Sequence, residues 1–300
     1  MTSRHPLGPI VAATDFSAPA RHAAQRAARL AQETGAPLTL MHVQPGGPLQ
    51  ELRRWLGEGH ALEQQLVDEA GRQLDELVAQ LHAGRTPGIR ALQATGAPVD
   101  EIVREAETQE VGLLVVGARG AGFLRRMVLG STSERLLRRT KRPVLVVRQT
   151  PHEPYRRVLV ALDFSPWSAH AITLARRVAP HAKLLLLNAC QVPFESKLHY
   201  AGVDEATIDR YRRQARADAT QRVHALALAS HLKPGDWEPC IVEGEASQRI
   251  VELEQDKDCD LVVLGKHGTS VTEDLLLGSV SKHVLAEGST DVLVSTAHEA

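Results

Sequence analysis

The sequence predicts an α/β protein of two tandem three-layer domains, each with a five-stranded, mainly parallel sheet. Short apolar runs alternate with stretches of helical periodicity, which is typical of parallel strands joined by right-handed helical crossovers. The apolar runs are continuous rather than alternating, as expected when helices cover both faces of a sheet. A glycine pattern, Gly-x2-Gly-x9-Gly-Ser, occurs at residues 117–131 and again at residues 265–279, which indicates that the second half repeats the first.

In the first half, five apolar runs predict strands and four other stretches predict helices. The expected strands are residues 10–13, 38–43, 89–94, 113–116 and 144–147. The expected helices are residues 17–33, 49–81 with a break near residues 57–59, 99–108, and 134–142. Ser17 is a typical N-cap, Pro19 is tolerated in a first helical turn, and Gly35 is a typical helix stop.

The second half follows the first at a constant offset of 148 residues. The matched pairs include Asp15 and Asp163, Gly96 and Gly244, Gly117 and Gly265, Gly130 and Gly278, and Leu145 and Leu293. A constant offset means no net insertion, so gene duplication is the simple explanation. We expect one domain at residues 1–149 and another at 155–300, joined by a short linker at 150–154 that contains two prolines.

The composition excludes several classes of protein. Hydrophobic residues make up 43% of the chain and aromatic residues only 3%, so Leu, Val and Ala must fill the cores. A net charge of −1 argues against nucleic-acid binding by bulk charge. The three cysteines are far apart and form no disulfide or metal spacing, which favours a reducing compartment. Without an evident signal peptide or membrane span, we expect a soluble cytoplasmic protein.

The glycine pattern lies between a predicted strand and a predicted helix. Such a connection presents unpaired backbone N–H groups to an anion. Glycines allow positive φ and let a ligand approach the main chain closely. Hydroxyls at Ser131, Thr132 and Ser133 are suited to cap the helix or to donate to phosphate. The alternatives are that the loop is only a tight connection, and that Asp15 and Asp163 only cap the helices that follow them.

The two copies of this loop differ in charge. Residues 117–131 contain three arginines, Arg119, Arg125 and Arg126, and carry a net charge of +3. The counterpart, residues 265–279, contains Lys266, Glu273 and Asp274 and carries a net charge of −1. We therefore expect the first half to be the better polyphosphate site, and the second to be weaker, empty or dependent on a divalent ion. Alternatively, Arg125 and Arg126 are solvated surface residues.

These features resemble the universal stress protein family over nearly all of both halves. The resemblance is carried by Asp15 after the first strand, the glycine loop, and the closing segment at residues 143–148. It implies domains of the adenine-nucleotide α-hydrolase-like type, ATP binding, and dimer-like pairing through the last strands. In tandem members that pairing usually joins the two domains of one chain. It also implies that Asp15 contacts adenine or ribose.

The resemblance and the loop charges together define two sets of candidate nucleotide-binding residues. The set in the first half is Ala13, Thr14, Asp15, Val43, Val116, Gly117, Arg119, Gly120, Arg125, Gly130, Ser131, Thr132 and Ser133. The weaker set in the second half is Asp163, Gly265, Gly268, Gly278, Ser279, Val280 and Ser281.

The leading expectation is a cytoplasmic stress-response protein that binds ATP, with or without Mg²⁺, and hydrolyses it slowly or not at all. We assign no catalytic residue, because no base is evidently placed to activate water. The sequence has no P-loop, no dinucleotide fingerprint after its first strand and no His-Glu-x-x-His motif. Two alternatives stay open: an interaction module that needs no nucleotide, and a slow ATP-cleaving enzyme that uses Asp15 and a divalent ion. The expected partners are the nucleotide and the other domain of the same chain, and a homodimer is left open. We expect no nucleic-acid or membrane partner.

Overall fold

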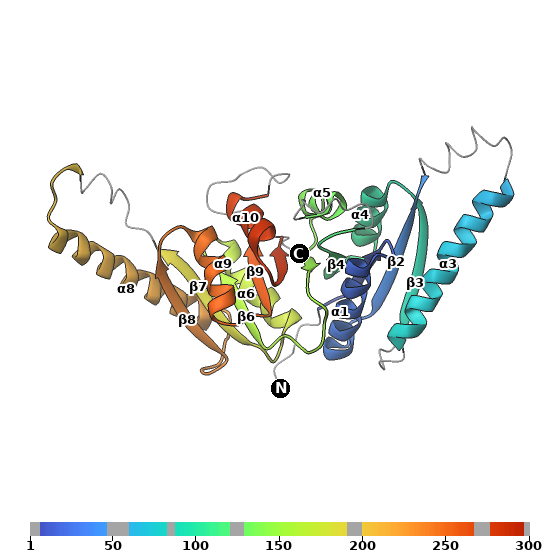
Figure 1. Cartoon of the computed structure of the whole chain (residues 1–300). Coiled ribbons are helices and arrows are strands. Elements are labelled where there is room, and N and C mark those ends of the chain that lie inside the picture. Colours follow the sequence, from blue (N-terminus) through green and yellow to red (C-terminus); the bar gives the residue numbers. More distant parts are fainter. Residues whose placement is uncertain are drawn as a thin grey trace. The chain divides into compact units, whose positions relative to one another are not determined.

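A computed structural model describes residues 7–46, 60–82, 88–120, 129–190, 200–266 and 277–296 (Figure 1). The chain divides into two compact units. The first unit comprises Met1–Pro154 and Asp291–Ala300, and the second comprises Tyr155–Thr290. The first unit therefore includes the last strand of the chain, which belongs by sequence to the second repeat.

The first unit alternates strands and helices as the sequence predicts. Its elements are β1 (Ile10–Thr14), α1 (Ala18–Thr34), β2 (Leu38–Pro45), α3 (His60–His82), β3 (Ile89–Gly96), α4 (Pro98–Thr108), β4 (Leu113–Gly117), α5 (Ser131–Arg139), β5 (Val144–Val147) and β10 (Asp291–Ser295). The strand order is β3-β2-β1-β4-β5-β10, and the pairs among β1 to β5 are parallel. The predicted mainly parallel α/β fold is confirmed. The predicted break at residues 57–59 lies outside the described residues.

The second unit has the same alternation. Its elements are β6 (Arg157–Ala161), α6 (Trp167–Val178), β7 (Lys183–Cys190), α8 (Glu205–Ala229), β8 (Trp237–Glu243), α9 (Ala246–Asp256), β9 (Leu261–Gly265) and α10 (Ser279–Glu287). The strand order is β9-β6-β7-β8, and these pairs are parallel.

The core of the first unit lies on both faces of its sheet. All five residues of β4 are buried, although successive side chains of a strand point to opposite faces. Helices must therefore cover both faces, as the continuous apolar runs predicted. Helix α1 packs on β1 and β4 and is bounded as predicted: Ser17 caps its start, and Gly35, with φ of 73°, caps its end. The first unit thus has the predicted three layers.

Helix α5 begins three residues earlier than the sequence predicted. The prediction was residues 134–142, whereas α5 covers Ser131–Arg139. The reason is the N-cap: Gly130 occupies that position, with φ of −68° and ψ of 145°. The three hydroxyl residues expected to precede the helix therefore form its first turn. Their backbone N–H groups are the ones that an α-helix leaves without intrahelical partners.

The last strands of the two repeats, β5 and β10, pair in antiparallel fashion, as the resemblance implied. Leu293 lies opposite Leu145, and these two residues are also equivalent at the offset of 148. Asp291, at the start of β10, is fully buried. Its Oδ1 accepts hydrogen bonds from the N–H groups of Arg148 (2.8 Å) and Gln149 (3.1 Å). Polar contacts as well as the strand ladder therefore hold β10 in the first unit.

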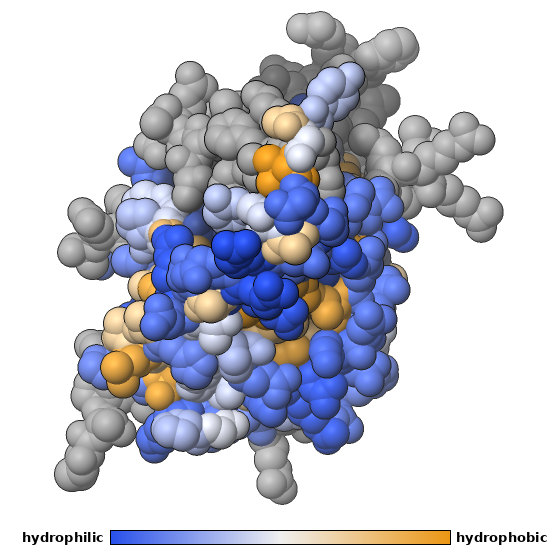
Figure 2. Space-filling view, turned by 90° about the vertical axis from the view of Figure 1, so that its left-hand side faces the viewer, coloured by the Kyte–Doolittle hydropathy of each residue, from blue (hydrophilic) through white to orange (hydrophobic). Residues whose placement is uncertain are grey.

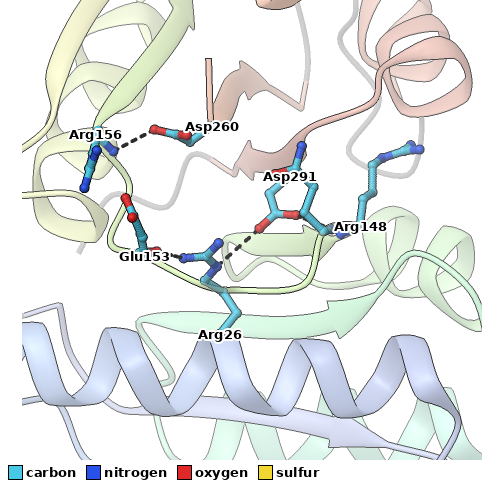
Figure 3. Close-up of polar contacts among 7 residues, drawn as sticks. Arg26, Arg148, Glu153, Arg156, Asp260 and Asp291 are labelled. Atoms are coloured by element: carbon cyan, nitrogen blue, oxygen red, sulfur yellow. Dashed lines mark hydrogen bonds and ion pairs between the residues drawn. The ribbon is translucent and has the colours of Figure 1, made fainter. Parts of the chain in front are cut away.

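Arg26, on α1, completes this buried polar cluster (Figure 3). Its Nε lies 3.4 Å from Asp291 Oδ2, and its Nη1 donates to the carbonyl oxygen of Glu153 at 2.8 Å. In the second unit, Asp260 Oδ2 accepts from the N–H groups of Arg156 and Arg157 at 2.7 and 2.8 Å. Asp260 is only half-buried. The Arg26–Asp291 pair is therefore the more deeply buried of these two arrangements.

The surface on the side of α8 is mainly hydrophilic, with small separate hydrophobic patches (Figure 2). Helix α8 buries only a narrow stripe of side chains, which includes Ile208 and Val223. Among its exposed apolar side chains is Leu228. Scattered apolar residues of this kind are ordinary on protein surfaces. None of the helices within the described ranges is both long enough and apolar enough to cross a membrane.

Candidate functional site

A cavity of about 470 Å³ lies in the first unit at the carboxyl ends of β1, β2 and β4. The strand order places β2 and β3 on one side of β1, and β4 and β5 on the other. Ligands of open parallel α/β sheets bind at such a reversal, outside the carboxyl ends of the strands. The described first-half candidates all line this cavity: Ala13, Thr14, Asp15, Val43, Val116, Gly117, Arg119, Gly120, Gly130, Ser131, Thr132 and Ser133. Arg125 lies outside the described residues.

A strained turn forms the β1 side of the cavity. Phe16 has a positive φ of 63°, an uncommon conformation for a residue other than glycine. The Thr14 hydroxyl accepts from the Phe16 N–H at 3.0 Å, and the Phe16 ring stacks on His42 with centroids 4.4 Å apart. Phe164 repeats this conformation in the second unit, with φ of 61°. Both copies keep this strained conformation, and such strain is common at functional sites. The residue before it, Asp15 or Asp163, is therefore a candidate functional residue.

The two carboxylate oxygens of Asp15 face different partners. Oδ1 accepts from the Ser17 N–H at 3.1 Å and from the Ser17 hydroxyl at 2.5 Å, so it stabilises the turn before α1. The N-cap itself is Ser17, whose side chain accepts from the Ala20 N–H, so Asp15 supports the cap residue and does not cap α1 itself. Oδ2 lies against Gly120, because a Cβ on that glycine would come within 2.7 Å of it. Asp15 is exposed at the cavity wall. The Asp15 carboxylate therefore stabilises the turn before α1 with one oxygen and faces the glycine loop with the other.

The described motif glycines, Gly117, Gly120 and Gly130, provide space rather than positive φ. Neither Gly117 nor Gly120 has a positive φ, and Gly130 has φ of −68°. A Cβ on Gly117 would lie 2.8 Å from the carbonyl carbon of Pro19, at the start of α1. A Cβ on Gly130 would meet nothing closer than 3.5 Å, which is ordinary contact. Close approach of main-chain segments is therefore the physical need at Gly117, whereas the neighbour of Gly120 is the movable side chain of Asp15.

We expect Gly117→Ala to lower the free energy of unfolding by about 1–3 kcal/mol, because the added methyl group overlaps main-chain atoms that cannot rotate away. Urea unfolding followed by circular dichroism measures this loss. Gly130→Ala is the matched control, since its new methyl group meets only ordinary contacts. Equal stability of the two variants would contradict this account of Gly117.

The start of α5 lies at the cavity and has the geometry that suits an anion. Its N-cap, Gly130, has no side chain, so the first-turn N–H groups have no side-chain cap. Helix N-termini of this kind attract negative charge. Ser131 and Thr132 are exposed there, and Arg119 lies on the same wall. The Ser133 hydroxyl instead donates to the Gly117 carbonyl at 2.8 Å. The Ser133 hydroxyl is therefore bound to the main chain in this structure, and a role of Ser131, Thr132 or Ser133 in phosphate binding stays a prediction.

Sequence reasoning missed several residues that line the cavity. They are Ala20, Met41, His42, Pro45, Pro98 and Ile102. Met41 and His42 directly precede the predicted Val43, so strand position could have indicated them. Pro98 and Ile102 come from α4, which packs against β2 and β3. The sequence offered no signal for that packing. Most of these residues are apolar, which gives the cavity a side suited to a flat ring.

The equivalent cavity of the second unit is smaller, about 240 Å³. The described second-half candidates line it: Asp163, Gly265, Gly278, Ser279, Val280 and Ser281. Gly268 lies outside the described residues. Ser281 repeats the contact of Ser133, because its hydroxyl donates to the Gly265 carbonyl at 2.8 Å. Among the described lining residues Asp163 is the only charged one, whereas the first cavity also has Arg119.

Comparison with known proteins agrees with the repeat. The model of the universal stress protein family matches residues 7–148 and again residues 154–296. The chain belongs to the universal stress protein family. The resemblance drawn from the motifs is confirmed, and this universal stress protein is a tandem member with two family domains.

Relatives over the whole length support the tandem organisation. A universal stress protein of Mycolicibacterium smegmatis is 28% identical over 302 residues, covering 95% of this chain and 96% of its own. A universal stress protein of Mycobacterium tuberculosis is 28% identical over 313 residues and covers 95% of each chain. The crystal structure of a universal stress protein from Archaeoglobus fulgidus matches with a TM-score of 0.68 and 19% identity, covering 97% of this chain and 99% of that one. This last likeness supports the fold.

Proposed function

We propose that the first unit of this universal stress protein binds ATP in its 470 Å³ cavity and serves as a nucleotide-binding regulator in the cytoplasm. The observation that carries the proposal is the convergence of three features on one cavity. These are the uncapped N-terminus of α5, the loop with Arg119, and the Asp15 carboxylate. Their chemistry matches the parts of a nucleoside triphosphate.

Each wall of the cavity suits one part of the ligand. Unpaired N–H groups and the guanidinium of Arg119 favour the polyphosphate. Asp15 Oδ2 is suited to accept from ribose hydroxyls or from an amino group of the base. Met41, Val43 and Ile102 offer apolar surface for the ring. A polyphosphate bound here would also be able to carry Mg²⁺.

We expect hydrolysis to be slow. Asp15 is the only carboxylate among the described lining residues, and one of its oxygens already accepts two hydrogen bonds from Ser17. A general base must reach the attacking water in the correct geometry. Occupancy by ATP, rather than its turnover, is therefore the proposed signal to a partner.

Calorimetric titration of the whole chain with ATP, with and without Mg²⁺, tests the proposal. We expect saturable binding that Arg119→Gln weakens about tenfold, because a charge-assisted contact to phosphate is lost. Arg90→Gln is the matched control: Arg90 is an exposed arginine on β3 that pairs with Glu105 and does not line the cavity. Its ATP affinity should stay unchanged.

Other outcomes would favour the alternatives. Absence of heat and of any ATP-induced thermal shift in the wild type would reject the proposal and favour a nucleotide-independent interaction module. Multiple-turnover phosphate release that Asp15→Ala abolishes would instead favour a slow ATP-cleaving enzyme. Both assays use the whole chain.

A further inference from the structure

We infer that helix α8 of one chain docks against helix α3 of a second copy of this universal stress protein. The two helices occupy the same place in the two repeats, because each connects the second and third strands of its unit. They differ in charge, and they carry large apolar side chains that are exposed to solvent. The inference concerns assembly and does not depend on the proposed nucleotide site.

Each of these helices covers its sheet with one face and leaves the opposite face exposed. Helix α3 packs against β2 and β3, and α8 packs against β7 and β8. Strands β3 and β8 lie at the edges of their units. Leu74 and Leu77 are among the side chains that α3 buries, and Ile208 and Val223 are among those that α8 buries. The outer faces therefore present polar and charged side chains to other molecules.

The outer face of α3 is acidic. Between residues 64 and 82 the helix has four carboxylates and one arginine, a net charge of −3 with histidine counted as neutral. Asp68, Asp75 and Glu76 are exposed, and their spacings of seven and eight residues place them on the same side of the helix. At 1.5 Å per residue these carboxylates span about 12 Å along the axis. The arginine, Arg72, is paired with Glu69 of the same helix.

The outer face of α8 is basic. Residues 205–229 include five arginines and three carboxylates, a net charge of +2. Arg212 is held by two carboxylates of its own helix, at 2.8 and 2.9 Å. Arg210, Arg213 and Arg216 are exposed and follow one another at intervals of three residues. They span about 9 Å along the axis, a length similar to that of the acidic row on α3.

Large exposed apolar side chains lie on the same two helices. Leu66 of α3 is 41% exposed, and Tyr211 and Leu228 of α8 are 53% and 76% exposed. Tyr200, which is 98% exposed, lies just before α8. Single residues of this kind are ordinary on a surface. Here they coincide with the charged rows, and tyrosine and arginine together are enriched at protein interfaces.

The opposite charges select a second copy of the chain as the partner. Each chain has one acidic α3 and one basic α8, so a two-fold dimer would make the same contact twice. Contacts between two α3 helices or two α8 helices would instead place like charges together. The surface on the side of α8 is mainly hydrophilic (Figure 2). A single exposed ion pair contributes little, so we expect a weak contact that needs several pairs and is sensitive to salt.

Sedimentation velocity of the whole chain tests the inference. At about 20 mM salt we expect self-association that increases with protein concentration, and at about 500 mM salt the association constant should fall at least about tenfold. Tyr211→Ala should weaken association about fivefold, because it removes an apolar side chain from the middle of the contact. A wild type that stays monomeric at low salt would overturn the inference.

Charge reversal identifies the two helices. The acidic-α8 variant carries Arg210→Glu, Arg213→Glu and Arg216→Glu, and the basic-α3 variant carries Asp68→Arg, Asp75→Arg and Glu76→Arg. Neither variant alone should self-associate, because α3 and α8 then have the same sign of charge. An equimolar mixture should associate as the wild type does, because each variant supplies the helix that complements the other. Failure of the mixture to associate, as expected of a contact within one chain, would overturn the inference.

A matched control separates these helices from net charge. It carries Arg104→Glu, Arg139→Glu and Arg249→Glu, which change exposed arginines on α4, α5 and α9. It has the same net charge as the acidic-α8 variant and should self-associate like the wild type. If a triple variant fails to fold, Arg213→Glu with Arg104→Glu as its control gives the same comparison. Equal loss of association in variant and control would overturn the inference, and so would full association of the acidic-α8 variant.

Discussion

Asp291→Ala should lower the free energy of unfolding by about 3–5 kcal/mol, because it removes the carboxylate that balances the charge of the buried Arg26 guanidinium. The side chains of Arg26 and Asp291 are 5% and 0% exposed. The substitution also removes the acceptor of two backbone N–H groups, those of Arg148 and Gln149. Buried donors without acceptors add to the loss. Urea unfolding followed by circular dichroism measures the effect.

Two further variants make this expectation specific. Asp260→Ala also removes an acceptor of two backbone N–H groups, but Asp260 is half-buried, so its cost should be smaller. Replacing Arg26 and Asp291 together with methionine and leucine should cost less than the sum of the two single changes, because no unpaired charge remains buried. If Asp291→Ala were no more costly than Asp260→Ala, the buried pair would not be the feature that secures β10.

Comparison of the two repeats could not have predicted the Arg26–Asp291 cluster. At the offset of 148 residues, Arg26 corresponds to Leu174 and Asp291 to Pro143. Neither counterpart is charged, so the duplication gives no sign of an ion pair. The resemblance to the family implied pairing through the last strands, and β5 and β10 do pair. The polar contacts that hold β5 and β10 together come from residues that are charged in only one of the two repeats. Their proximity is visible only in the structure.

The fold itself was predictable because its signals are local and repeated. Continuous apolar strands indicated a sheet covered on both faces, and the fixed offset made one half support the other. The candidate residues of the first cavity followed from the glycine motif and the family resemblance, and the structure adds that β1, which Asp15 follows, and β4, which Gly117 ends, are neighbouring parallel strands. The contribution of α4 did not follow, because Pro98 and Ile102 reach the cavity only through packing against β2 and β3.

Hydroxyl groups were the least predictable part of the site. A serine near a loop has several possible partners, and the choice depends on distances of a few tenths of an ångström. Ser133 was expected to cap the helix or to donate to phosphate, and in this structure its hydroxyl donates to the Gly117 carbonyl. In the second unit, Ser168 rather than Ser165 donates its hydroxyl to Asp163. Of these three serines, only Ser133 was among the predicted site residues, and the structure determines the partners of all three.

Gly120→Asp should weaken ATP binding by the first unit about 100-fold while leaving the fold intact. The new carboxylate would lie where a Cβ already comes within 2.7 Å of Asp15 Oδ2, on the wall of the proposed phosphate site. At an effective dielectric constant of about 20, two like charges 4 Å apart repel by roughly 4 kcal/mol. Even if the phosphates shift partly away from the new carboxylate, ATP affinity should fall strongly. Asp15 is exposed and its side chain can rotate, so stability should change little.

Calorimetric titration with ATP measures this loss, and two variants assign its cause. Gly120→Asn has nearly the same shape without the charge, so it should cost only about tenfold, which isolates the electrostatic part. Arg90→Gln changes an exposed arginine that does not line the cavity and should keep normal affinity. If Gly120→Asp bound ATP as tightly as Arg90→Gln, the phosphates would not lie against this loop. The uncapped N-terminus of α5 would then need another ligand to explain why the chain leaves those N–H groups facing the cavity.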